Sequence, residues 1–123
     1  MNPSPVTFPS HITLQEFVDK YVYHYHYKMF PVVDGSRVAG IITTQAIKTV
    51  PHEEWHHLQV GGLMQPQSPD NSVDPDTPVK EALSKMSGSG LSRLLVLEHG
   101  KMVGIVTLKD LLEFLALKAE LEA

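Results

Sequence analysis

The chain has 123 residues, of which 42% are hydrophobic and 20% are charged, so its composition is that of a folded protein and not of a disordered one. It has no cysteine and a net charge of −4 without a basic run, which excludes disulfides and thiolate zinc sites and argues against a nucleic-acid partner. No apolar run reaches the roughly 20 residues that a membrane-spanning helix needs.

The sequence contains an internal duplication. Three pairs of segments match: residues 30–34 with 94–98 and 40–43 with 104–107, both at a shift of 64, and residues 14–18 with 79–83 at a shift of 65. We therefore divide the chain into a first copy, residues 1–63, and a second copy, residues 64–123. Because a unit of about 60 residues has little core of its own, the two copies are expected to share a buried face.

The first copy carries the signals of a helix followed by a hairpin. Apolar residues at helical spacing predict a helix over residues 14–25. The stripe consists of Leu14, Phe17, Val18, Tyr21, Val22 and Tyr25. Two short apolar runs, residues 31–33 and 38–42, flank Asp34-Gly35 and predict a β-hairpin. Residues 65–76, rich in Pro, Ser and Asp, are predicted to join the copies.

The second copy repeats this order. Thr77-Pro78 supplies a capping residue and a proline for the first turn of a helix, whose apolar stripe is Val79, Ala82, Leu83 and Met86. Apolar runs at residues 94–97 and 102–106 flank His99-Gly100, and a leucine-rich helix is predicted over residues 108–121. Each copy thus reads helix, strand, strand, helix, and the fold class is α+β.

These duplicated segments resemble a tandem CBS domain pair, also called a Bateman module. The resemblance is carried by FPVVD at residues 30–34, GIIT at 40–43 and GIVTLKD at 104–110. It implies two repeats related by pseudo-twofold symmetry, with short parallel and antiparallel sheets and packed helices. It also implies a regulatory module, not an enzyme, that binds an adenosine nucleotide between the copies. The ligands to expect are AMP, ADP, ATP or S-adenosylmethionine.

A further likeness points to the CBS pair at the C-terminal end of site-2-protease-like intramembrane zinc metalloproteases. It rests on residues 14–33, on PHEEW at residues 51–55 before VGGLM at 60–64, and on the leucine-rich end at 111–121. This likeness implies a covalently attached membrane protease domain as a partner. The expected location is the cytoplasm, or the cytoplasmic face of a membrane.

The resemblance implies a ligand site in the second copy. The family motif is glycine, two apolar residues, Ser or Thr, two variable residues and Asp, and Thr107 and Asp110 match it. The Thr107 hydroxyl would contact phosphate, the Asp110 carboxylate would accept hydrogen bonds from the ribose hydroxyls, and Arg93 would reach the phosphates. The first copy keeps Thr43 but has Ala46 and Met29 at the other two positions, so we expect one competent cleft and one degenerate cleft.

Another interpretation of the same residues needs no ligand. Thr107 followed by Asp110 at the start of a helix is also a capping pair, and Arg93 could be a solvated strand residue. Capping and phosphate binding use the same free N–H groups at a helix N-terminus. The sequence therefore leaves both interpretations open.

The histidines suggest metal sites, which we weigh against simpler explanations. His52-Glu53-x-x-His56 matches the H-E-x-x-H pattern of zinc hydrolases, but Pro51 places it at a helix start or in a loop. His24 and His26 would share one face of a strand, whereas on the predicted helix they lie about 200° apart. We expect neither a metal site nor a catalytic residue, and a zinc-binding hydrolytic domain stays as an alternative.

The last helix is more apolar than a one-sided surface helix requires. Its apolar residues are Leu108, Leu111, Leu112, Phe114, Leu115, Leu117 and Leu121. It could pack across both copies, or one edge could form a homodimer contact, which we favour because leucines on more than one stripe leave apolar area to cover. A purely structural dimerisation module without a ligand is therefore a second alternative function.

Overall fold

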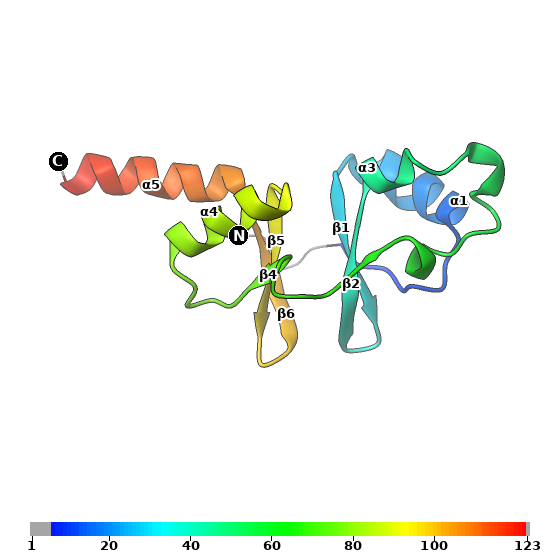
Figure 1. The fold of residues 1–123 in the computed structure, drawn as a ribbon, viewed down its shortest axis with the longest axis horizontal. Coiled ribbons are helices and arrows are strands. Elements are labelled where there is room, and N and C mark those ends of the chain that lie inside the picture. The colour runs from blue at the N-terminus through cyan, green and yellow to red at the C-terminus, as the bar shows by residue number, and fades with distance from the viewer. Residues whose placement is uncertain (1–5, 123) are drawn as a thin grey trace. The chain divides into compact units, whose positions relative to one another are not determined.

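The computed structural model describes residues 6–122, which form two compact units, residues 6–67 and residues 68–122 (Figure 1). Residues 1–5 of the first copy and Ala123 of the second copy lie outside the described residues. Within residues 6–122, none of the helices combines the length and the hydropathy needed to cross a bilayer. Both units contain a small sheet with helices, as the α+β prediction requires.

The first unit begins with one helix in three parts: α1 (Leu14–Phe17), η1 (Val18–Val22), which is a π-helix, and α2 (Tyr23–Tyr25). The Thr13 hydroxyl caps it by accepting a hydrogen bond from Glu16 N at 3.1 Å. His26, in the left-handed conformation with φ 59°, ends it. The predicted helix over residues 14–25 is thus confirmed, although its π-helical turn was not predicted.

The sheet of the first unit has three strands in the order β1-β2-β3. β1 (Met29–Asp34) and β2 (Arg37–Thr43) form the predicted hairpin, and β3 (Gln65–Pro66) pairs antiparallel with β2. The short helices α3 (Thr44–Ile47), η2 (His52–Glu54) and η3 (Val60–Gly62) lie between β2 and β3 in sequence. We call the segment between β2 and β3 the connector. Phe8, the first helix, the hairpin and the connector together form one core, whose buried residues are Phe8, Leu14, Phe17, Val18, Phe30, Val32, Ala39, Ile42, Ile47, Trp55 and Val60.

The second unit has a sheet in the order β4-β5-β6. β4 (Ser72–Val73) pairs parallel with β5 (Arg93–Glu98), which pairs antiparallel with β6 (Lys101–Thr107). α4 (Val79–Ser89) precedes this hairpin, and α5 (Leu108–Glu122) follows it and extends well beyond the sheet of its unit (Figure 1). The buried core residues are Val73, Ala82, Met86, Leu94, Val96 and Leu111.

The two hairpins share one register. The pair Met29 and Thr43 corresponds to Arg93 and Thr107 at a shift of 64, and every further pair of the hairpin keeps that shift, as does the irregularity after Val32 and Val96. A parallel contact from the preceding segment is also repeated, since Phe8 bridges to Val32 and Val73 pairs with Val96. The duplication seen in the sequence is therefore a duplication of backbone structure.

A glycine is required where β3 meets β2. A Cβ atom at Gly40 would lie 2.9 Å from the carbonyl carbon of Gln65 and closer still to the carbonyl oxygen. Because these are backbone atoms, no side-chain movement could relieve the contact. Gly40 therefore allows the third strand to close this sheet.

Two local expectations were wrong. Residues 65–76 are more than a linker, because β3 and β4 lie within them. Thr77 does not cap α4, whose N-cap is Pro78 without a side-chain hydrogen bond; the Thr77 hydroxyl instead accepts a hydrogen bond from Asp74 N at 3.0 Å. Both features depend on local pairing that composition does not reveal.

Candidate functional site

The end of the hairpin in the second unit brings together two of the three predicted site residues. Arg93 is the first residue of β5 and Thr107 the last residue of β6, and the two are direct partners in the antiparallel register. The N–H of Leu108 donates to the carbonyl of Ser92 at 2.8 Å, which fixes the turn from β6 into α5. Arg93 and Thr107 are thereby held side by side at the N-terminus of a 15-residue helix.

The third residue, Asp110, lies in the first turn of α5 and takes part in a reciprocal cap. Its N–H donates to the Thr107 hydroxyl at 3.0 Å, and its carboxylate accepts from the Thr107 N–H at 3.4 Å. The first bond has ordinary length, whereas the second is long. The pair therefore satisfies helix N–H groups that would otherwise lack a partner, as the capping interpretation requires.

A hollow of about 610 Å³ lies against this corner. Its lining residues are Ser92, Arg93, Thr107, Leu108, Lys109, Leu112, Glu113 and Ala116. Arg93 and Thr107 therefore line the hollow, and Asp110 is not among the lining residues. A volume of this size is in the range of small-molecule sites in proteins.

The charges around the hollow favour an anion at one end. Within residues 6–122 the Arg93 guanidinium forms no ion pair, while Lys109 pairs with Glu113 at 4.0 Å with both side chains largely exposed. The N-terminus of α5 adds the positive end of the helix dipole, while the N–H groups of Leu108 and Asp110 already have partners within the chain. A guanidinium beside a helix N-terminus is suited to phosphate oxygens, and the apolar stems of Leu108 and Leu112 are suited to a flat ring.

The first unit has the same backbone at the corresponding corner but different chemistry. Thr43 again caps the next helix, accepting from Ala46 N at 3.2 Å, yet α3 has only four residues. Met29 replaces the cation and is 4% exposed, and Ala46 offers no carboxylate. This corner has neither the counter-charge nor the acceptor that the second unit provides.

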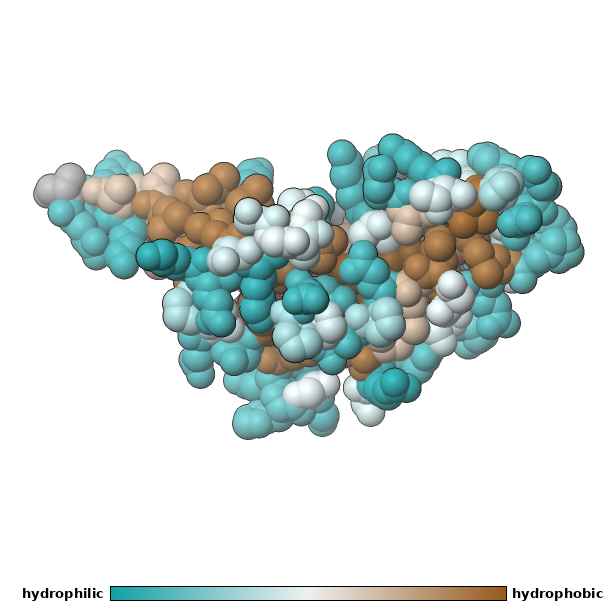
Figure 2. All heavy atoms as spheres, viewed as in Figure 1, coloured by the Kyte–Doolittle hydropathy of each residue, from teal (hydrophilic) through white to brown (hydrophobic). Residues whose placement is uncertain are grey.

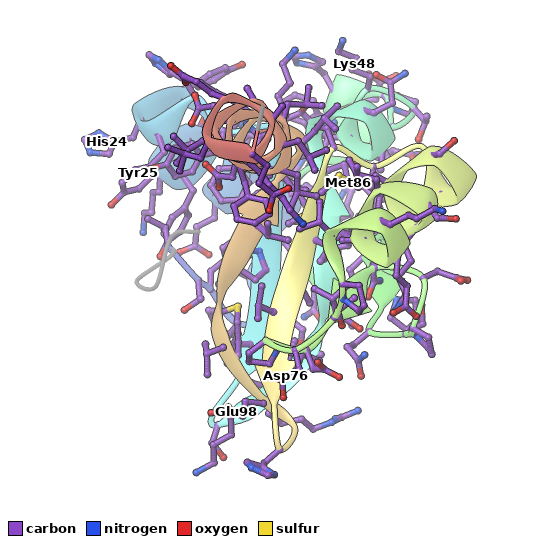
Figure 3. The ribbon with its side chains drawn as sticks, turned by 90° about the vertical axis from the view of Figure 1, so that its left-hand side faces the viewer. His24, Tyr25, Lys48, Asp76, Met86 and Glu98 are labelled. Carbon is purple, nitrogen blue, oxygen red and sulfur yellow. The ribbon has the colours of Figure 1, made fainter. Side chains whose placement is uncertain are left out.

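The histidines of the H-E-x-x-H pattern are placed by aromatic contacts. His52 lies in the short helix η2 and stacks on Trp55, with ring centroids 4.0 Å apart, while the ring of His56 lies 4.0 Å from that of His57. His24 lies in α2 and His26 just beyond it, and both are exposed. Figure 3 shows His24 pointing outward from the ribbon. Among residues 6–122, no group of three or more His, Cys, Asp or Glu residues could hold a metal ion.

The sequence analysis missed several residues of the hollow. Lys109, Leu112, Glu113 and Ala116 lie at positions i, i+3, i+4 and i+7 of α5, so they share one helix face. The sequence does contain this information, because counting helical turns from Thr107 places these four residues on the helix face next to the motif residues.

Comparison with known proteins places the chain in a family. The family model described as CBS domain matches residues 1–53 and again residues 60–117. The chain belongs to the CBS domain family. Since two copies match, it is a tandem CBS pair, as the sequence predicted.

The relatives agree with this assignment. The CBS pair is 30% identical over 125 residues to a zinc metalloprotease of Methanocaldococcus jannaschii, which confirms the predicted likeness to metalloprotease-associated CBS pairs. That match covers 99% of this chain and 33% of the relative, so the chain spans about a third of the relative's length.

Solved structures confirm the fold. A CBS domain pair crystallised with 5′-methylthioadenosine and S-adenosyl-L-methionine has a TM-score of 0.75 at 26% identity, over 94% of this chain and 90% of that one. A CBS domain protein of Thermoplasma acidophilum has a TM-score of 0.79 at 26% identity, over 93% of this chain and 65% of that one.

Proposed function

We propose that this CBS pair is a regulatory module that binds an adenosine nucleotide through Arg93, Thr107 and Asp110 of its second repeat. The observation that carries the proposal is the pairing of Arg93 with Thr107 at the N-terminus of α5, beside a hollow of about 610 Å³. The complex of a similar CBS pair with 5′-methylthioadenosine and S-adenosyl-L-methionine supports the adenosine chemistry. AMP, ADP, ATP and S-adenosylmethionine are the ligands to test.

Each residue has a distinct task in this proposal, and that of the Thr107 hydroxyl is to contact phosphate. Arg93 donates to phosphate or carboxylate oxygens of the ligand, and the N-terminus of α5 adds the positive end of its helix dipole on the same side. The Asp110 carboxylate accepts hydrogen bonds from the ribose hydroxyls of the ligand. In this structure it accepts a hydrogen bond from the Thr107 N–H at 3.4 Å.

The regulated partner would be an attached metalloprotease domain. The support is the similarity to the zinc metalloprotease of M. jannaschii, of which this chain covers 33%. The ligand would act by binding one conformation of the pair more tightly than another, because only a difference in affinity can shift an equilibrium. In this arrangement the CBS pair does no chemistry itself and changes the activity of the domain to which it is joined.

A second candidate function is homodimerisation, favoured by the exposed apolar stripe of α5. Phe114, Leu117 and Leu121 are 50%, 53% and 76% exposed and share one face of the helix. Figure 2 shows apolar residues along the visible surface of α5. A second copy of the chain, packing its own α5 on this stripe, would cover it by an isologous contact.

Calorimetry on the intact chain tests the nucleotide proposal. Each of the four ligands is titrated into the parent and into Arg93→Met, which gives the second repeat the residue that the first repeat has at Met29. We expect binding to the parent and a loss of about tenfold or more in the variant, since hydrogen bonds to charged groups are worth about 1.5–3 kcal/mol. Lys101→Met removes a positive charge at the far end of the hairpin and is the matched control.

The outcomes separate the two candidates. Equal binding by parent and Arg93→Met would refute the site. The absence of binding for all four ligands, in a chain that is dimeric, would leave the structural module as its function.

A further inference from the structure

The first unit has a cavity that the proposed nucleotide site does not use. It has a volume of about 380 Å³ and is lined only by residues between Val18 and Trp55, so it belongs to this unit alone. It lies among η1, α3 and the connector that follows α3. The apolar part of its wall is made by Val18, Val22, Ile47, Val50 and Trp55.

Trp55 presents only apolar surface to this cavity. The side chain is 7% exposed, and its ring N–H donates to the carbonyl of Val50 at 3.0 Å, so its one polar atom already has a partner. His52 stacks on it, with ring centroids 4.0 Å apart and an angle of 25° between the rings. The connector thus supplies an aromatic wall whose ring N–H is already hydrogen-bonded within the chain. Such a wall suits a flat or branched apolar group.

The cavity also has one cationic group and no acidic residue in its wall. Lys48 follows the last turn of α3, is exposed, and extends from the end of that helix (Figure 3). Within residues 6–122 no carboxylate forms an ion pair with its ammonium group. Tyr23 and Thr44 add neutral hydroxyl groups, while Glu53 and Glu54 of the connector do not line the cavity.

We propose that this cavity binds a small amphiphilic carboxylate, one with an aromatic or branched aliphatic body. The body packs against Trp55 and the valines, and the carboxylate meets the Lys48 ammonium and the neighbouring hydroxyl groups. The volume of about 380 Å³ is within the range of protein sites for small molecules, and a few polar groups around a mostly apolar wall are the usual design of such sites. This site is independent of the nucleotide site, because the two share no residue.

Tryptophan fluorescence reports on this cavity directly, because Trp55 is the only tryptophan in the sequence. The 123-residue chain is excited selectively at tryptophan and titrated with 4-phenylbutyrate, and then with 4-phenylbutyramide, which has the same body without the charge. We expect a saturable change in tryptophan emission, with weaker binding of the amide. Lys48→Met should weaken binding of the carboxylate by about 1.5- to fivefold, the range for a solvent-exposed ion pair, and leave binding of the amide unchanged.

Lys20→Met is the matched control, because Lys20 lies on η1 in the same unit, is 66% exposed and does not line the cavity. It should bind both probes as the parent does. The proposal is overturned if 4-phenylbutyrate gives no saturable change, or if Lys48→Met and Lys20→Met have equal affinities. It is also overturned if the emission depends on protein concentration and not on the carboxylate, since a second copy of the chain would then occupy the cavity.

Discussion

Replacing Asp110 separates its two roles, the helix cap and the ribose acceptor. In Asp110→Ala the carboxylate bond to Thr107 N is lost, and at 3.4 Å this bond contributes little, about 0.5 kcal/mol. The carboxylate also lies in the first turn of α5, where a negative charge stabilises a helix by about 0.3–1 kcal/mol. Together these predict that the free energy of unfolding falls by about 1 kcal/mol, which corresponds to a decrease in Tm of about 4 °C.

The same substitution has a larger predicted effect on the ligand. Loss of the acceptor for the ribose hydroxyls should weaken nucleotide binding by about 1–3 kcal/mol. Asp110→Asn keeps an oxygen that can accept both bonds, so it should recover part of each effect. Thermal unfolding followed by circular dichroism gives the first quantity, and calorimetry with the tightest of the four ligands gives the second. If Asp110→Ala lowers Tm as predicted while the Kd is unchanged, Asp110 is a cap only and its assignment to the site is wrong.

Three further predictions concern stability and assembly. Gly40→Ala should lower the free energy of unfolding of the first unit by about 2 kcal/mol or more, because the new methyl group meets the backbone of Gln65. Urea unfolding measures this, and an unchanged urea midpoint would contradict the close approach of β3. Leu117→Lys should convert a dimer into a monomer in light scattering while the circular dichroism spectrum stays that of a folded chain, since the side chain is 53% exposed within the chain; a parent that is monomeric at all concentrations would exclude the dimer. Hydrogen bonds from the Ser10 N–H and hydroxyl hold the pKa of Asp34 below its ordinary value, so the folded state should lose stability as the pH falls from about 4 through that lowered pKa. Ser10→Ala should reduce this loss, and an identical pH dependence of the urea midpoint in both proteins would contradict the assignment.

The hairpins and their register could be predicted from the sequence because several local signals agree there. Alternating or continuous apolar runs, a glycine at the turn and the shift of 64 all point to the same pairing, and Gly35 and Gly100 adopt the positive φ that such turns require. The π-helical turn Val18–Val22 could not be predicted, because the spacing of the apolar residues between Leu14 and Tyr25 fits an ordinary α-helix. β3 and β4 have two residues each and exist only through their pairing, so no local pattern marks them.

The candidate site was predictable in composition and less so in geometry. The motif predicted Thr107 and Asp110, the resemblance added Arg93, and the register places Arg93 and Thr107 opposite each other. The sequence left open whether Asp110 caps the helix or faces a ligand, and in the structure its N–H and carboxylate both bond to Thr107. Capping and ligand binding need the same residue types at the same spacing, so sequence patterns alone do not distinguish them.

The difference between the repeats lies in space as well as in side-chain chemistry. The backbone register at Met29 and Thr43 is the same as at Arg93 and Thr107, so the strand pairing does not distinguish the two corners. Met29, however, is 4% exposed, and an arginine there would place a charge out of contact with water, at a free-energy penalty of several kcal/mol unless a partner is supplied. α3 has four residues where α5 has fifteen, so the first repeat also has a weaker helix dipole to offer an anion. The corner of the first repeat therefore offers a phosphate neither an exposed cation nor a long helix, and we expect that a change of Ala46 to an acid alone does not create a nucleotide site there.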